Sequence, residues 1–181
     1  LPEEDSVSFK KGSFNTTHSG EGVEIAVINL PHISNFTDIE PFLEEPDVSL
    51  RIVDNVEDVG SPQAIILPGS KNVIHDLKFI RSAGFGNKIR TCLEDGCEIV
   101  GICGGYQMLG RVINDPYEIE SGDGQITGLG YLDMETTIER DKNLTRKSGR
   151  HALSGQRIFG YEIHHGVSSP TGSPVVNFDD G

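Results

Sequence analysis

The chain has 181 residues, of which 35% are hydrophobic and 24% charged, as is typical of a globular domain with a sizeable core. Its formal net charge of −13 disfavours nucleic acid, whose phosphates are bound by clustered Lys and Arg. No segment reaches the roughly 18 apolar residues of a transmembrane helix, and the acidic start is unlike a signal peptide. We therefore expect a cytoplasmic protein that binds neither nucleic acid nor a membrane.

The three cysteines, Cys92, Cys97 and Cys103, fall in one short segment. An odd number without distant partners does not predict a disulfide framework and favours a reducing compartment. Cys92 and Cys97 also lack the C-x-x-C spacing and the second pair that a zinc site needs. We interpret these two as structural, and we expect no metal site.

The first 22 residues are polar and rich in Gly, Ser and Thr, which predicts a linker or tail before a folded part that begins at Val23. The run 23–30 is β-branched and almost continuously apolar, as in a strand buried on both faces of a parallel sheet. Residues 33–42 have possible helix caps followed by apolar residues at helical spacing. This pattern predicts a first β-α unit.

The same alternation continues as far as residue 112. It predicts strands over 48–54, 63–69 and 97–103, and helices over 72–84, 87–96 and 105–112. Strands that alternate with helices predict an α/β fold: a doubly wound, mostly parallel, flavodoxin-like sheet with helices on both faces. In such sheets ligands bind at the carboxyl ends of the strands.

Beyond residue 115 the sequence becomes rich in turns. Residues 131–137 and 156–164 are predicted to be strands, and the charged stretch 139–151 between them is predicted to be an exposed loop that lacks order.

Cys103 lies where a predicted strand meets a predicted helix, in the sequence Gly101-Ile102-Cys103-Gly104-Gly105. This G-x-nucleophile-x-G form is typical of a nucleophile elbow, in which small neighbours avoid clashes around a strained residue. A thiol at a helix N-terminus has a lowered pKa, and the N–H that follows it can face an oxyanion. The alternative is a tight β-α turn with a buried cysteine.

A second loop, Pro68-Gly69-Ser70, also follows a buried strand. The backbone N–H groups of Gly69 and Ser70 can act as further oxyanion donors beside that of Gly104. The sequence Gly69-Ser70-Lys71 also suggests a phosphate-binding loop, but the G-x-x-x-x-G-K-[ST] pattern is absent from the chain. Two such loops at one edge of a sheet favour a catalytic site at Cys103.

Four segments together resemble the glutaminase domain of cobyric acid synthase. They read LPHISNFTDIEPF (30–42), LPGSKNVIHDLKFIR (67–81), GICGGYQMLG (101–110) and GYEIHHG (160–166). The resemblance implies a class I-type glutamine amidotransferase fold in which Cys103 attacks the carboxamide of glutamine. It also implies an oxyanion hole formed by Gly104 and the Gly69–Ser70 loop.

The resemblance further implies that Gln107 and the loop with His164 and His165 hold the substrate glutamine. For Gln107 the alternative is a solvated helix residue. No cofactor is expected in this domain. The ammonia would pass to an ATP- and Mg-dependent synthetase domain, which precedes this one in the same polypeptide and binds the corrinoid substrate.

The histidine base is the part of the site that the sequence does not supply clearly. A thiol nucleophile needs a base, and of the six histidines His164 and His165 stand at a strand end. The resemblance instead implies a histidine in a later G-T-Y-x-H-G segment, which the sequence lacks. We therefore favour a substrate-binding role for His164 over a catalytic one, and expect a domain over 23–181 that is truncated at its C-terminus.

Three other functions stay open at this point. One is the glutaminase of cobyrinic acid diamide synthase, and another is the glutaminase that amidates cell-wall lipid precursors. The third is a non-catalytic flavodoxin-like module.

Overall fold

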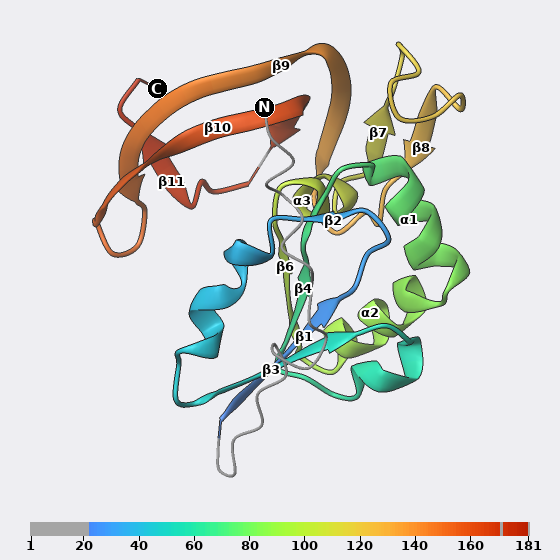
Figure 1. The fold of residues 1–181 in the computed structure, drawn as a ribbon, viewed down its shortest axis with the longest axis vertical. Coiled ribbons are helices and arrows are strands. Elements are labelled where there is room, and N and C mark those ends of the chain that lie inside the picture. Colours follow the sequence, from blue (N-terminus) through green and yellow to red (C-terminus); the bar gives the residue numbers. More distant parts are fainter. Residues whose placement is uncertain (1–21, 171, 181) are drawn as a thin grey trace. The chain divides into compact units, whose positions relative to one another are not determined.

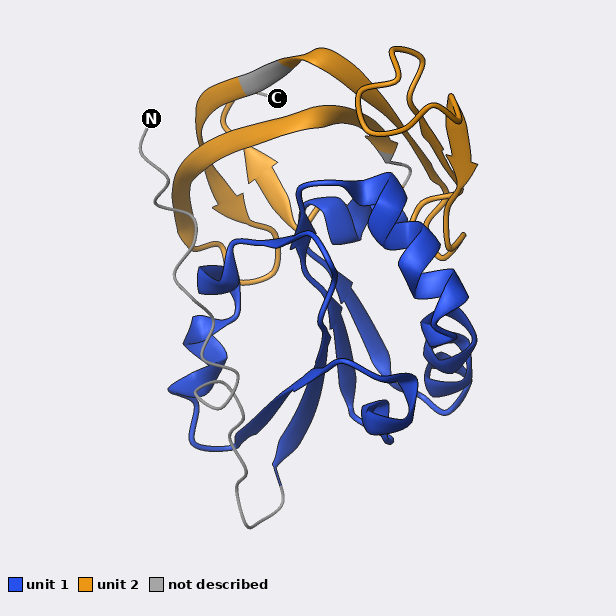
Figure 2. Ribbon diagram, turned by 45° about the vertical axis from the view of Figure 1, so that its right-hand side comes forward, with its two compact units in different colours: residues 1–109 blue, residues 110–181 orange. Residues whose placement is uncertain are grey.

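The computed structural model describes residues 22–170 and 172–180. They form two compact units, one up to Leu109 and one from Gly110 (Figure 2). The predicted linker, residues 1–22, lies outside the described part except for Gly22. None of the described helices is long and apolar enough to cross a membrane.

The first unit is built on a four-stranded parallel sheet in the order β3-β1-β4-β6. Its strands are β1 (Val23–Ile28), β3 (Val48–Val53), β4 (Ala64–Leu67) and β6 (Glu98–Gly101). All four strands were predicted, with ends that agree within two residues. The apolar runs account for this, because the last four residues of β1 are buried.

Helices α1 (Val73–Ser82) and α2 (Phe85–Glu94) connect β4 to β6 and cover one side of the sheet (Figure 1). Both were predicted, and the α/β class is confirmed. The Asn72 side chain caps α1 by accepting a hydrogen bond from the backbone N–H of His75 at 2.9 Å. A third helix, α3 (Gly104–Met108), follows β6. It is shorter than the predicted helix over 105–112, because the chain enters strand β7 by Val112.

The other side of the sheet is covered by two short 3-10 helices, η1 (Phe36–Asp38) and η2 (Glu40–Leu43), drawn in light blue in Figure 1. Apolar side chains of this segment pack against Ile25 and Val27 of β1. The predicted α-helix over 33–42 is therefore wrong. The backbone of Asn35 is in the left-handed conformation (φ 55°), which an α-helix does not contain. Pro41 has no N–H, so a helix that ran through Pro41 would lack one hydrogen bond.

Three short elements complete the first unit. The 3-10 helix η3 (Val56–Val59) follows β3. Strands β2 (Ile33–Ser34) and β5 (Gly69–Ser70) form a small antiparallel pair in which Ser34 lies opposite Gly69. This pair joins the loop after β1 to the loop after β4.

The second unit is a β-sheet in the order β10-β9-β7-β8, with β11 also paired to β9. Its strands are β7 (Val112–Asn114), β8 (Gln125–Thr127), β9 (Met134–His151), β10 (Arg157–Pro170) and β11 (Val176–Phe178). The predicted loop over 139–151 is wrong, because this stretch belongs to β9 and pairs with β10. The strand was missed because residues 139–151 are rich in charged side chains, many of them exposed, and lack an apolar alternation.

Candidate active site

Cys103 occupies the turn between β6 and α3 in a conformation that L-residues rarely adopt, with φ 49° and ψ −108°. The flanking glycines make this turn possible. A Cβ on Gly105 would lie 2.0 Å from the carbonyl oxygen of Leu67, and one on Gly101 would lie 2.6 Å from the backbone nitrogen of Tyr106. The predicted need for small residues on both sides of Cys103 is therefore confirmed.

The turn is also held by backbone hydrogen bonds. The N–H of Ile102 donates to the carbonyl oxygen of Leu67 at 2.9 Å, which joins the end of β6 to the end of β4. The N–H of Gly105 donates to the carbonyl oxygen of Ile102 at 2.8 Å. The N–H of Gln107 donates to the carbonyl oxygen of Cys103 at 3.1 Å. Cys103 is exposed, unlike Cys92 and Cys97, which are buried. An exposed thiol on a rigid turn is available to a substrate.

The Gly69–Ser70 loop lies directly beside this turn. A Cβ on Gly104 would come within 2.9 Å of the backbone nitrogen of Ser70, and one on Gly69 would be 3.8 Å from the Cβ of Cys103. The structure therefore brings together four of the predicted site residues, Cys103, Gly104, Gly69 and Ser70. Backbone N–H groups so close to a nucleophile can stabilise an oxyanion.

Gln107 lies one turn after Cys103 in α3 and is only 8% exposed. This burial excludes the alternative of a solvated helix residue.

His164 and His165 belong to β10 of the second unit, at a register shift between His164 and Gly166. His164 is half-buried and its Nε2 lies 2.7 Å from Oε1 of Glu162. Its Nδ1 is buried and has no hydrogen-bond partner among the described residues. His165 is exposed, with its Nδ1 3.3 Å from the carbonyl oxygen of Glu139. The Gly69–Ser70 loop, Gly104 and the hydrogen bonds that hold the Cys103 turn belong to the first unit.

Asp76 is the residue near this loop that the sequence analysis missed. It is fully buried in α1 and its carboxylate accepts from the Ser70 hydroxyl at 2.6 Å and lies 2.8 Å from Nδ1 of His32. A signal was present in the sequence: Asp76 stands in the buried stripe of α1 with Val73, Leu77 and Ile80. A carboxylate on an apolar helix face indicates a partnered, buried charge.

His32, His75 and Asp76 also offer three possible metal ligands, whose atoms all lie within 4.8 Å of one another. The 2.8 Å between His32 Nδ1 and Asp76 Oδ1 is a hydrogen-bond distance. Two ligands of a tetrahedral zinc, with bonds of about 2.0–2.1 Å, would stand roughly 3.3 Å apart. We therefore interpret this cluster as a hydrogen-bonded network.

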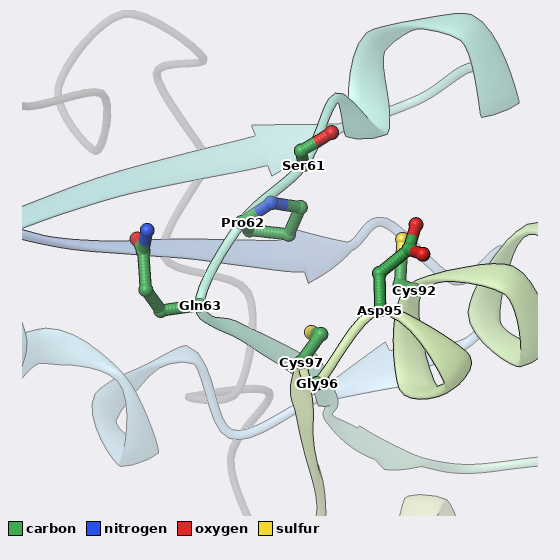
Figure 3. Close-up of a pocket in the computed structure, with 7 residues that line it drawn as sticks. All are labelled: Ser61, Pro62, Gln63, Cys92, Asp95, Gly96 and Cys97. Carbon is green, nitrogen blue, oxygen red and sulfur yellow. The ribbon is translucent and has the colours of Figure 1, made fainter.

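A pocket of about 190 Å³ lies elsewhere in the first unit (Figure 3). It is lined by the loop before β4, by Cys92 of α2 and by the turn between α2 and β6, which includes Cys97. This is the amino end of the parallel strands, whereas Cys103 follows their carboxyl end. Burial raises the pKa of the Cys97 thiol, and the neighbouring Cys92 and Glu98 raise it further. This shift disfavours the reactive thiolate and agrees with a structural role.

Two solved structures share the fold of this chain. A crystal structure of a glutamine amidotransferase matches with a TM-score of 0.57 and 19% identity, covering 78% of this chain and 70% of that one. The structure of PurLQS from Thermotoga maritima matches with a TM-score of 0.59 and 17% identity, covering 87% of this chain and 75% of that one. The chain therefore has the fold of glutamine amidotransferases.

The chain belongs to the CobB/CobQ-like glutamine amidotransferase domain family, whose model matches residues 24–180. It is 48% identical to the adenosylcobalamin biosynthesis bifunctional protein CobDQ of Leptospira interrogans, over 97% of this chain and 21% of that protein. It is 44% identical to the cobyric acid synthase of Desulfitobacterium hafniense (strain DCB-2), over 99% of this chain and 37% of that enzyme. The cobyric acid synthase of Geobacillus kaustophilus is 45% identical, over 99% of this chain and 36% of that enzyme. The chain thus spans about a fifth to two fifths of these relatives.

Proposed function

We propose that this chain is the glutaminase domain of a cobyric acid synthase and that Cys103 is its nucleophile. The observation that carries the proposal is the exposed Cys103 thiol on a glycine-flanked turn, beside the Gly69–Ser70 loop. The similarity to two cobyric acid synthases at 44% and 45% identity supports this enzyme over other amidotransferases.

The proposed reaction has two steps. The Cys103 thiolate attacks the carboxamide carbon of glutamine, and the carbonyl oxygen becomes an oxyanion. When the oxyanion collapses, the C–N bond breaks, the nitrogen takes a proton and leaves as ammonia, and a thioester remains. Water then hydrolyses the thioester to glutamate and the free thiol. A histidine base must carry the protons.

The backbone N–H groups of Gly104, Gly69 and Ser70 are the proposed donors to the oxyanion. They are suited to this role because backbone groups on a rigid turn need no reorganisation when the charge develops. We propose that Gln107, His164 and His165 hold the substrate. For His164 the support is its buried Nδ1, which has no partner in the described part of the chain and can donate to or accept from a ligand.

The rest of the proposal concerns the longer protein. The ammonia would serve a synthetase domain of the same polypeptide, which uses ATP and Mg²⁺ to amidate carboxylates of a corrinoid, cobyrinic acid a,c-diamide. No cofactor is proposed for the present domain. A cytoplasmic location is supported by the three cysteines, none of which forms a disulfide among the described residues, and Cys103 must stay reduced to react.

Covalent labelling of the full-length protein tests the proposal. The glutamine analogue 6-diazo-5-oxo-L-norleucine should modify Cys103, and glutamine should protect it. Peptide mass spectrometry should find Cys92 and Cys97 unmodified. Cys103→Ser should lose glutaminase activity by at least about a thousandfold, since the attacking thiolate is gone.

Cys92→Ala is the matched control, because it removes a thiol that the proposal does not use. It should keep the glutaminase activity and the labelling. Absence of selective labelling in a protein shown to be folded would contradict the enzymatic role and favour a non-catalytic module.

A further inference from the structure

The carboxylate of Asp76 connects three segments around the Gly69–Ser70 loop. Besides the Ser70 hydroxyl at 2.6 Å and the His32 ring at 2.8 Å, it accepts from the backbone N–H of His32 at 3.2 and 3.3 Å. Asp76 itself belongs to α1. A buried carboxylate is costly unless its oxygens are hydrogen-bonded, so these contacts are mutually dependent.

The Ser70 hydroxyl is fixed on two sides. It donates to Oδ2 of Asp76 and accepts from the backbone N–H of Asn72 at 3.0 Å. The N–H of Lys71 also donates to the carbonyl oxygen of His32 at 2.8 Å. The loop after β4 is therefore bonded both to α1 and to the His32 segment. Asp76 takes part in both connections, because it contacts Ser70 and His32.

This arrangement affects the backbone on which the oxyanion hole depends. The nitrogen of Ser70 lies beside Gly104, within 2.9 Å of the point where a Cβ would stand. Catalytic groups must be held to within about 0.5 Å of the productive geometry, and hydrogen-bonded supports provide such precision.

We propose that Asp76 is a positioning residue, which acts through the Ser70 hydroxyl to hold the Gly69–Ser70 backbone at the place where the oxyanion forms. The proposal rests on the proposed glutaminase function. Asp76 does not touch the substrate. Substitution of Asp76 should therefore slow only the step in which negative charge develops on the carbonyl oxygen of the substrate.

The test compares Asp76→Asn and Ser70→Ala in the full-length protein. Both variants should lower the glutaminase kcat by about ten- to a hundredfold, somewhat less than the loss of a whole oxyanion donor, and leave KM within about threefold. Alkylation of Cys103 by iodoacetamide forms no oxyanion, so its rate should stay within about twofold. Asp47→Asn, which changes an exposed carboxylate of the same unit, should leave all three quantities unchanged.

A double-mutant cycle separates this role from a general effect on folding. If Asp76 acts through Ser70, the double variant should have nearly the same kcat as Asp76→Asn alone. An unchanged kcat in folded Asp76→Asn and Ser70→Ala would overturn the proposal, and so would a parallel fall in the alkylation rate. Should Asp76→Asn not fold, Ser70→Ala alone carries the kinetic comparison.

Amide hydrogen exchange gives a readout that does not depend on the reaction. In Asp76→Asn, or in Ser70→Ala, residues 69–71 should exchange at least about tenfold faster than in the parent, because the loop opens more often. Unchanged exchange would overturn the positioning role. Absence of glutaminase activity in the parent protein would instead contradict the proposed function, and the exchange result would still decide how the loop is held.

Discussion

Gly105 has less space for a side chain than Gly101 and Gly104, the other glycines of the Cys103 turn. A Cβ there would lie 2.0 Å from the carbonyl oxygen of Leu67 and 2.8 Å from that of Pro68. Gly105→Ala must therefore displace the backbone of α3 or of the loop after β4. We expect it to lower the free energy of unfolding by about 1–3 kcal/mol or more, measured by urea denaturation, and to impair glutaminase activity.

Gly122→Ala is the control for this substitution, because no atom lies within 4 Å of its added Cβ. It should leave the activity unchanged and the stability equal or slightly higher. Equal stability of the two variants would show that the turn is more adaptable than the structure indicates.

Asp115 links the stability of the second unit to pH. Its side chain is fully buried in the second unit, where it accepts from the backbone N–H groups of Ile119, Glu120 and Ser121 at 2.8–2.9 Å. Burial raises the pKa of Asp115, but the three hydrogen bonds outweigh it and hold the pKa below its ordinary value. Since the folded-state pKa is depressed, the stabilisation is present above the unfolded pKa, about 3.9, and is lost as the pH falls through the folded one.

Asp115→Asn should therefore destabilise the second unit at neutral pH by about 1–3 kcal/mol, because an amide cannot accept all three bonds. The difference in the free energy of unfolding between this variant and the parent should shrink below about pH 4, because the parent then loses the stabilisation by Asp115. Thermal unfolding between pH 2.5 and 7 measures both effects, with Asp141→Asn, which changes an exposed carboxylate of the same unit, as the control. A constant difference across this range would contradict the assigned pKa direction.

Helix α1 connects helix stability to the site because it carries Asp76. Its cap is the Asn72 side chain, which accepts from the N–H of His75. Asn72→Ala should lower the free energy of unfolding of the first unit by about 1 kcal/mol, measured by urea denaturation. Asn72→Asp keeps an acceptor at the cap and should lower the free energy of unfolding only slightly. If the free energy of unfolding falls equally in both variants, the side-chain cap contributes nothing.

The elements of the first unit were predicted well because their strands are apolar runs and their helices have caps and glycine ends. The helix predicted over 33–42 is wrong because the left-handed backbone of Asn35 and the ring of Pro41 interrupt an otherwise helical pattern. The β2–β5 pair could not be predicted, since two-residue strands have no periodicity. The Asp76 network was missed for a related reason: which polar groups a buried carboxylate meets depends on tertiary packing.

The chain as a whole carries 28 acidic side chains against 15 basic ones, which gives a sequence pI of about 4.7. Self-repulsion at a net charge of −13 should keep the chain dispersed near neutral pH. We expect the lowest solubility near pH 4.7, where repulsion vanishes, and light scattering at low ionic strength measures it. A minimum more than about one pH unit away would indicate that many carboxyl pKa values are shifted.

The positive φ of Cys103 sets the stability of its turn against the activity proposed for it. A residue at φ 49° with a side chain costs of the order of 1–3 kcal/mol, and only glycine adopts such a conformation freely. The turn would thus be more stable with a glycine in place of Cys103, and such a chain could not form a thioester. Under the proposed function, the Cys103 thiol is therefore held at a thermodynamic disadvantage in exchange for its chemistry.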